Sequence, residues 1–134
     1  MKLITRETDY AVRALLYMAG GQAETVSVSE LVKALKVPWA FLRRIMQILN
    51  KKGLVESSRG KGGGFRLALP LEKIFLIDLM EKLQGRLKLN ECLFKKKICP
   101  DRNSCLLKKK IEGIEKEMIA KLKAITLDSL VRRG

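Results

Sequence analysis

A proline at position 38, set between two amphipathic stretches, constrains the fold of this 134-residue chain more than any other feature. Proline lacks a backbone N–H, so it interrupts the interior of a helix but suits the first turn of the next one. The capping box Ser27-Val28-Ser29-Glu30 predicts that a short helix begins there and runs to about Lys36. A second helix is predicted from Pro38 to Lys52. Two helices joined by so tight a break have the outline of a helix-turn-helix.

The second of these helices has two contrasting faces. Its inner face is apolar and comprises Phe41, Leu42, Ile45, Ile48 and Leu49. Its outer face comprises Ala40, Arg43, Arg44, Gln47 and Lys51. Arginine, lysine and glutamine can hydrogen-bond base edges and phosphates, and an alanine methyl group can contact a thymine methyl group. An ordinary amphipathic surface helix has the same pattern, and the pattern alone favours that simpler interpretation.

A glycine-rich basic segment follows, flanked by two short stretches with the alternation typical of strands. The predicted strands are residues 54–58 and 65–69, and Arg59-Gly60-Lys61-Gly62-Gly63-Gly64 connects them. Glycine allows the backbone to approach DNA closely, and Arg59 and Lys61 supply positive charge at the tip. A nucleotide-binding glycine loop would open a helix, whereas this segment leads into a strand. A helix-turn-helix followed by a basic hairpin predicts a winged helix that binds DNA.

The charge of the chain points to a polyanionic partner. Lysine and arginine number 28 against 14 aspartate and glutamate residues, a formal net charge of +14. Such an excess favours nucleic acid through counterion release, and a solvated basic surface or a membrane surface are the alternatives. We expect double-stranded DNA and no membrane binding, because no helix combines a basic face with an aromatic, lipid-inserting one. A cytoplasmic location is expected, because no signal peptide or membrane-length apolar run is evident.

The chain contains no histidine. This excludes histidine-based acid–base catalysis, serine and cysteine triads and histidine-containing zinc sites. A Walker loop, paired catalytic carboxylates and a nucleophile elbow are also absent from the sequence. We therefore do not expect an enzyme.

The remaining apolar periodicity predicts three further helices and a short tail. Helices are expected at residues 5–19, 74–83 and 105–124, with a tail helix at 127–132 capped by Thr126. In the long helix an apolar stripe recurs at steps of three and four, at Leu107, Ile111, Ile114, Met118, Leu122 and Ile125. A lone helix has nothing to cover this stripe, so it predicts dimerisation with a second copy; packing on its own domain is the alternative.

The expected fold class is mainly α with a small β-hairpin. It consists of a winged helix-turn-helix domain followed by a long C-terminal dimerisation helix. The predicted parts are a DNA-binding domain at residues 1–85, a cysteine-containing loop at 86–104, and the dimerisation helix with its tail at 105–134.

Three cysteines lie close together in the sequence, among many lysines. Cys92, Cys99 and Cys105 are separated by six and by five residues. In an intracellular protein this suggests a metal site more than a disulfide, and the spacing does not match a zinc ribbon. Thiolates suit iron–sulfur clusters, and nearby lysines favour thiolate over thiol. A two-iron or four-iron cluster is therefore one interpretation, and buried or incidental thiols would give the same spacing.

With these features the chain resembles the IscR/NsrR-type family of winged-helix iron–sulfur transcription regulators, over nearly its whole length. The resemblance rests on five features, namely Thr8-Asp9-Tyr10-Ala11-Val12-Arg13, Gly53-Leu54-Val55, the glycine-rich segment through Phe65, the three cysteines and Ile125-Thr126-Leu127. The glycine-rich segment and the cysteines together are quite specific to that family.

The resemblance implies a homodimer on a palindromic operator. Each subunit would place one recognition helix in a major groove and its wing along the minor groove. By similarity, Arg59 is a minor-groove contact, and Ala40, Arg43 and Arg44 occupy the base-reading positions. The residue types at those positions differ from those of IscR, so the operator sequence does not carry over.

The resemblance also implies that an iron–sulfur cluster on the three cysteines controls DNA binding. The first cysteine gap is six residues rather than the usual five, which a loop tolerates. The IscR branch has a histidine ligand just after the third cysteine, where this chain has Leu106-Leu107-Lys108. In the nitric-oxide-sensing branch the fourth ligand is an acidic residue on the first helix of the partner subunit, a position that matches Asp9. Asp101, Glu7 and an external thiol are the alternatives.

The expected function is a transcription regulator whose cluster senses redox state, nitric oxide or iron–sulfur supply. A regulator of the same fold without a cluster, answering to a thiol signal or a protein partner, is the alternative. An RNA-binding or ribosomal accessory protein and a small iron–sulfur electron carrier represent other classes. The wing and recognition helix argue against the carrier, and a preference for palindromic duplex DNA over structured RNA would distinguish the regulator from an RNA-binding protein.

Overall fold

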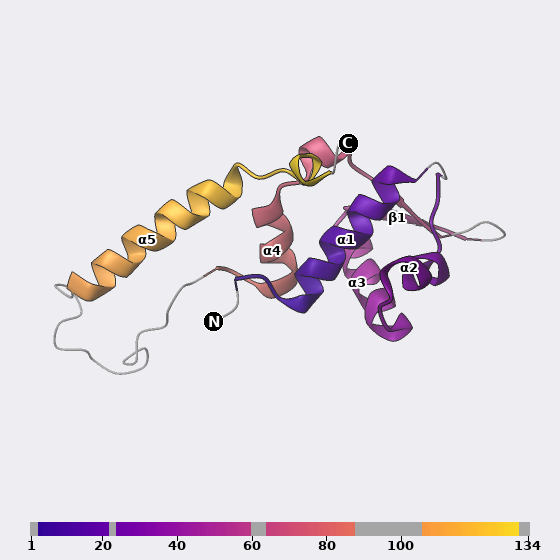
Figure 1. Ribbon diagram of the computed structural model, residues 1–134, viewed down its shortest axis with the longest axis horizontal. Coiled ribbons are helices and arrows are strands. Elements are labelled where there is room, and N and C mark those ends of the chain that lie inside the picture. The colour runs from indigo at the N-terminus through magenta and orange to yellow at the C-terminus, as the bar shows by residue number, and fades with distance from the viewer. Residues whose placement is uncertain (1–2, 22–23, 60–63, 88–105, 132–134) are drawn as a thin grey trace.

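The computed structural model describes residues 3–21, 24–59, 64–87 and 106–131. These residues form a helical body with one small antiparallel sheet, and a long helix projects from it (Figure 1). The α-helices are α1 (Arg6–Gly20), α2 (Val28–Leu35), α3 (Trp39–Lys51), α4 (Leu76–Gln84) and α5 (Leu106–Lys123). The strands are β1 (Val55–Ser58) and β2 (Gly64–Leu67), and the short 3-10 helices are η1 (Leu71–Lys73) and η2 (Leu127–Leu130). The expected class, a mainly α fold with a small β-hairpin, is confirmed.

The helix-turn-helix forms where the capping box and the proline predict it. The Ser27 hydroxyl accepts a hydrogen bond from the Glu30 backbone N–H at 3.1 Å and caps the start of α2. Lys36 ends α2 in the left-handed conformation, with φ 57° and ψ 45°, and its N–H donates to the Val32 carbonyl. Pro38 then occupies the N-cap of α3. The sharp turn between the helices therefore depends on a left-handed lysine and a proline.

The wing, defined here as β1, β2 and their connection, is anchored to the residue before the α2 cap. Strands β1 and β2 pair with Val55 opposite Leu67 and Ser58 opposite Gly64. Val26 extends this pairing, because it donates to and accepts from the Phe65 backbone, both at 2.8 Å. These two hydrogen bonds fix the wing against the helix-turn-helix.

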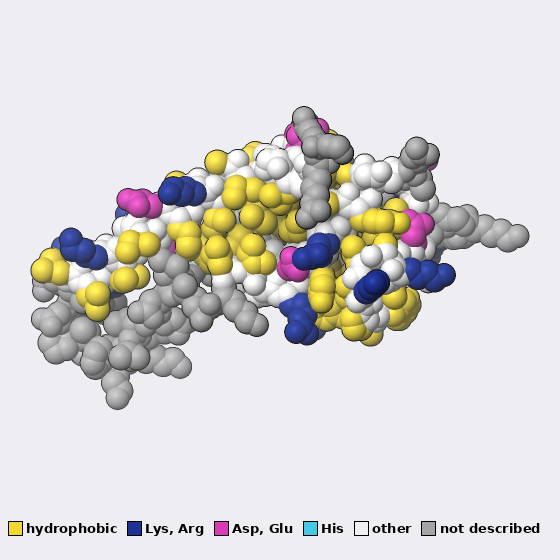
Figure 2. Space-filling model, viewed as in Figure 1, with side chains coloured by type: hydrophobic (Ala, Val, Ile, Leu, Met, Phe, Trp, Pro, Cys, Tyr) yellow, Lys and Arg dark blue, Asp and Glu magenta, His cyan; other side chains and the backbone are white. Residues whose placement is uncertain are grey.

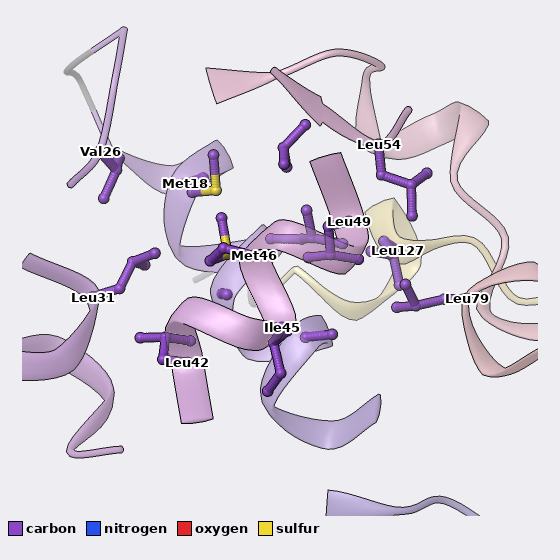
Figure 3. Close-up of a cluster of buried hydrophobic side chains, with 14 of the residues drawn as sticks. Met18, Val26, Leu31, Leu42, Ile45, Met46, Leu49, Leu54, Leu79 and Leu127 are labelled. Carbon is purple, nitrogen blue, oxygen red and sulfur yellow. The ribbon is translucent and has the colours of Figure 1, made fainter. Parts of the chain in front are cut away.

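One apolar cluster unites the helix-turn-helix, the wing and the helices packed against them. Its members come from α1, α2, α3, β1, η1, α4 and η2, and they include Leu15, Leu42, Leu49, Leu79 and Leu127. Figure 3 shows Leu127 beside Leu49 and Leu79 within this cluster. Because Leu127 is completely buried, the C-terminal end of the described chain is part of the core of the domain that begins with α1.

The helix predicted at residues 74–83 begins two residues late, and the start of that prediction was wrong. Ile74 and Phe75 are extended, since Leu76 N–H donates to the Ile125 carbonyl and Leu127 N–H donates to the Ile74 carbonyl, both at 2.9 Å. These hydrogen bonds to the C-terminal segment replace the helical ones. The tail predicted as a helix at 127–132 is instead the short 3-10 helix η2, which ends at Leu130.

Helix α5 is anchored at one end and exposed at the other. Near its C-terminal end, Leu122 packs against Leu76, Ile77 and Met80 of α4 in a second apolar cluster. Toward its N-terminal end, the side chains of Leu107 and Ile114 are 71% and 54% exposed. Apolar side chains lie on the surface of the projecting helix in Figure 2. None of the helices in the described ranges is long and apolar enough to span a membrane.

Candidate nucleic-acid interface

Helix α3 separates a buried face from an outer face, as the sequence predicts. Leu42, Ile45, Met46 and Leu49 are buried, whereas Phe41 and Ile48 are half-buried. The predicted inner face is thus confirmed in outline, and Met46 is an additional core residue. The rings of Phe41 and Tyr10 of α1 form a T-shaped pair, with ring centroids 5.6 Å apart and an interplanar angle of 83°. This contact fixes the orientation of α3 on α1.

The outer face of α3 consists of exposed residues, namely Trp39, Ala40, Arg43, Arg44, Gln47, Asn50 and Lys51. Successive residues of an α-helix are about 100° apart, so these seven residues share an arc of about 140°. The structure therefore brings the predicted outer-face residues onto one surface. Trp39 and Asn50, which belong to the same arc, were not among the predicted DNA-binding residues.

The two arginines of this face have different neighbours. Arg44 Nη1 lies 3.9 Å from Glu7 Oε1 of α1, and the Glu7 side chain is only 27% exposed. The guanidinium carbon of Arg43 lies 5.1 Å from the centroid of the Trp39 ring, a cation–π distance. Arg44 is thus drawn toward α1, and Arg43 is placed over the indole at the start of α3.

The start of α3 is favourable for an anion. Pro38 provides no side-chain hydrogen bond to the first turn, and that turn contains no acidic residue. The partial positive charge of the first backbone N–H groups is therefore not offset by a capping side chain. A phosphate group near this end of the outer face would be stabilised.

The wing presents its two described arginines differently. Arg66 pairs with Glu56 at 2.8 Å and with Glu24 at 3.4 Å. The hydrogen bond that Arg66 donates to the Glu56 carboxylate raises the Arg66 pKa further above its usual value. With two carboxylates beside it, Arg66 has no excess positive charge to offer a phosphate. Arg59, at the end of β1, is exposed and has no ion-pair partner among the described residues. Lys61 lies outside the described residues.

Residues 4–133 match the sequence profile of the Rrf2 family, whose description is "iron-dependent transcriptional regulator". The chain belongs to the Rrf2 family of transcription regulators. It is 34% identical over 130 residues to protein aau3 of Rhizobium meliloti, covering 96% of this chain and 84% of that protein. It is 32% identical over 90 residues to the HTH-type transcriptional regulator NsrR of Shouchella clausii, covering 66% of this chain and 60% of NsrR.

Solved structures share the fold of this Rrf2 chain. CymR of B. subtilis, described as the global cysteine regulator, superposes with a TM-score of 0.72 at 24% identity, covering 97% of this chain and 96% of CymR. IscR of T. potens superposes with a TM-score of 0.71 at 24% identity, covering 100% of this chain and 94% of IscR. At these identities the similarity establishes the winged-helix fold.

The predicted cluster ligands of this Rrf2 chain are only partly within the described residues. Cys92, Cys99, Cys105 and the alternative ligand Asp101 lie outside them. Asp9 lies in α1 with its side chain 49% exposed, and its Oδ2 accepts a hydrogen bond from Arg13 Nε at 3.1 Å. Among the described residues no three cysteine, aspartate or glutamate side chains are grouped as a metal site would require. Asp9 thus stands apart from other potential ligands within its own described chain.

Gln84 is a positioning residue that sequence reasoning missed. Its Oε1 accepts hydrogen bonds from the Thr5 N–H at 3.1 Å and from the Thr8 hydroxyl at 2.8 Å. Its Nε2 donates to the Leu3 carbonyl at 2.8 Å. Gln84 therefore ties the end of α4 to the start of α1, the helix that contains Glu7 and Asp9. The sequence provides no signal for this contact, because its partners are 76 or more positions apart.

Proposed function

We propose that this Rrf2 regulator is a homodimer that binds a palindromic operator in double-stranded DNA. The observation that carries the proposal is the outer face of α3, where Ala40, Arg43, Arg44, Gln47 and Lys51 share one exposed arc. The opposite face of α3 is buried, so the helix has one fixed orientation. The arc provides donors for base edges and phosphates, and Arg59 provides a separate cation on the wing for a minor groove. A net charge of +14 supports a polyanionic partner.

The exposed part of α5 supports the homodimer. Leu106, Leu107 and Ile114 leave large apolar surfaces in water, and a second copy of the helix would cover them. The C-terminal part of the stripe packs on α4 through Leu122. Packing on its own domain therefore applies to the C-terminal half of the helix, and we propose that dimerisation applies to the N-terminal half. A two-fold axis near α5 would relate two α3 helices, which a palindrome requires to be about 34 Å apart.

We further propose that Cys92, Cys99 and Cys105 hold an iron–sulfur cluster, with Asp9 of the partner subunit as the fourth ligand. Three thiolates form a donor set suited to such a cluster, and the family description names iron. Asp9 is more exposed than Glu7, which is half-buried toward Arg44. Asp9 is therefore the more accessible of these two carboxylates. The bound cluster would supply a redox- or nitric-oxide-sensitive group whose state alters DNA affinity.

The experiment that tests DNA recognition is selection from a random duplex library with the full chain purified without oxygen. We expect enrichment of one palindromic sequence, with an affinity that falls steeply with salt because phosphate contacts release counterions. Sedimentation should show a dimer. Absence of an enriched duplex, or equal affinity for a structured RNA hairpin, would overturn the proposal of an operator-binding regulator.

The experiment that tests the cluster is iron and sulfide analysis with an absorption spectrum of the same preparation. We expect stoichiometric iron and sulfide and visible absorption. A preparation that selects the palindrome yet contains no iron and accepts none under reconstitution would favour the cluster-free regulator. The cluster-free regulator is the second candidate because the chain shares its fold with CymR, a cysteine regulator. Reaction of the three thiols with an oxidant, followed by measurement of DNA affinity, would then test a thiol signal.

A further inference from the structure

Trp39, the single tryptophan of the chain, is exposed at the start of α3. Its exposed fraction is 47%, whereas Leu42 and Met46 farther along the same helix are completely buried. An indole is one of the largest apolar side chains, and leaving half of it in water forgoes much of its hydrophobic stabilisation. Neither apolar cluster of the described residues contains Trp39. Packing within the described domain therefore does not account for a tryptophan at this position.

The Trp39 ring instead contacts the guanidinium group of Arg43. The guanidinium carbon lies 5.1 Å from the ring centroid, and residues i and i+4 of a helix are neighbours on its surface. No ion pair engages Arg43 within the described part of the chain. A guanidinium stacked on an aromatic ring keeps its hydrogen-bond donors free in its own plane. The pair therefore holds a fork of donors beside a flat apolar surface, with part of the rotamer entropy of Arg43 already lost.

The pair lies at the N-terminal end of the outer face of α3. Trp39 and Arg43 are about 40° apart around the helix axis, and Gln47 is a further 40° along the same arc. The N-terminal residues of a recognition helix approach base edges most closely when the helix enters a major groove. An arginine fork fits the O6 and N7 atoms of guanine, and an apolar surface fits the 5-methyl group of thymine. Trp39 and Arg43 together present both.

We infer that Trp39 is a specificity-determining residue of the DNA interface, and that with Arg43 it reads a thymine methyl group adjacent to a guanine. The inference rests on the proposed function, because it requires α3 to enter a major groove. Trp39 contacts the thymine directly and positions the Arg43 fork on the neighbouring guanine. The operator therefore contains a thymine next to a guanine at the same place in each half-site.

The test uses the full chain and the duplex that the wild-type protein enriches from a random library. In that duplex each thymine beside a guanine is replaced in turn by deoxyuridine, which removes only the methyl group. At the contacted thymine we expect wild-type affinity to fall about fourfold, the effect of one methyl group removed from an apolar contact. Trp39→Ala should bind more weakly than wild type and should be insensitive to the same replacement. Equal deoxyuridine sensitivity of Trp39→Ala and wild type would overturn the inference.

The single tryptophan also reports on its own environment. Binding of the enriched duplex should reduce the quenching of Trp39 fluorescence by acrylamide, because the ring becomes covered. Unchanged quenching at saturating duplex would overturn the inference while the proposed function stands. If no duplex is enriched, the proposed function and the inference about Trp39 are both overturned.

Three further measurements separate the contact from folding. Leu130 is 40% exposed on η2 and does not belong to the outer face of α3. Leu130→Ala removes exposed apolar surface and should leave DNA affinity and its deoxyuridine sensitivity unchanged. Thermal unfolding of Trp39→Ala should match wild type, because the indole belongs to no core cluster of the described residues. Trp39→Phe should restore part of the sensitivity, since a smaller ring keeps an apolar face for the methyl group.

Discussion

The carbonyl oxygen of Val26 lies 2.5 Å from the position that a Cβ atom would take on Gly64. The Val26 carbonyl carbon and the Ser27 nitrogen are also within 3.0 Å of that position. All three are backbone atoms at the α2 cap, so they cannot move aside without displacing the helix-turn-helix. Glycine at position 64 is therefore what allows the wing to pair with Val26.

Gly64→Ala should lower the free energy of unfolding by about 1–3 kcal/mol, the usual cost of overpacking a closely packed contact. It should also weaken DNA binding, because the wing is displaced from α3. Gly20→Ala is the matched control, since nothing lies within 4 Å of its Cβ position, and it should leave stability unchanged or slightly raised. Urea unfolding of both variants checks the difference. Equal stability of the two variants would contradict this account of the wing.

The glycine-rich segment illustrates what sequence pattern can and cannot predict. Alternation and glycine content predict a hairpin, and the structure confirms strands on both sides of it. The same pattern assigns all four glycines to an approach toward DNA, whereas Gly64 is required by a contact inside the protein. That contact joins residues 38 positions apart in the sequence, and the pattern near Gly64 does not indicate Val26 as its partner.

Lys36→Gly should stabilise the protein. Lys36 adopts φ 57°, a left-handed conformation that costs a residue with a side chain roughly 1–2 kcal/mol. Glycine avoids this cost but loses more backbone entropy on folding, so we expect a net gain of about 0.5–1 kcal/mol. Lys52→Gly is the control, because Lys52 has φ −87° and should lose stability. If Lys36→Gly unfolds at a lower urea concentration than wild type, then contacts of the Lys36 side chain outweigh the backbone cost.

The segment around Ile74 shows where the local sequence pattern does not predict the secondary structure. Apolar spacing predicts a helix from residue 74, yet Ile74 and Phe75 are extended. The Leu127 N–H donates to the Ile74 carbonyl, and the Ile125 carbonyl accepts from the Leu76 N–H. The C-terminal residues return to the core after the whole length of α5, and helical periodicity contains no information on such a return. The helices themselves were predicted within one or two residues, since each has a cap or an apolar face in its own sequence.

Arg59 and Arg66 should differ in their contribution to DNA binding, although both belong to the wing. Arg59 is exposed with no ion-pair partner among the described residues, so Arg59→Ala should weaken operator binding by roughly 1–3 kcal/mol. The loss should be greatest at sites with a narrow, A·T-rich minor groove. Arg66→Gln should change affinity by less than about twofold, because Glu56 and Glu24 already offset its charge. Fluorescence anisotropy with the enriched duplex compares the variants, and the reverse order would show that the other side of the wing faces DNA.

The candidate cluster site was the least predictable part from single-chain reasoning. Cysteine spacing proposes three ligands, but a fourth from the partner subunit leaves no pattern in the sequence around the cysteines. The described residues show the ion pairs of the two candidate carboxylates. Asp9 pairs with Arg13 at 3.1 Å, and Glu7 lies 3.9 Å from Arg44. A carboxylate in an exposed ion pair can exchange partners at little cost, because such pairs contribute about 0–1 kcal/mol.

Asp9→Ala should therefore leave a cluster with an altered absorption spectrum or a shorter lifetime in oxygen. Cys→Ser at position 92, 99 or 105 should abolish the visible absorption, because each substitution removes a thiolate ligand.

Arg13→Ala should keep the wild-type spectrum, since it frees the Asp9 carboxylate without removing it. Glu7→Ala is the second control and should leave the cluster intact, because Glu7 is turned toward Arg44. Anaerobic spectra, iron content and the rate of bleaching in air provide the comparison. If Asp9→Ala matches wild type in all three measurements while Glu7→Ala does not, the fourth ligand is Glu7.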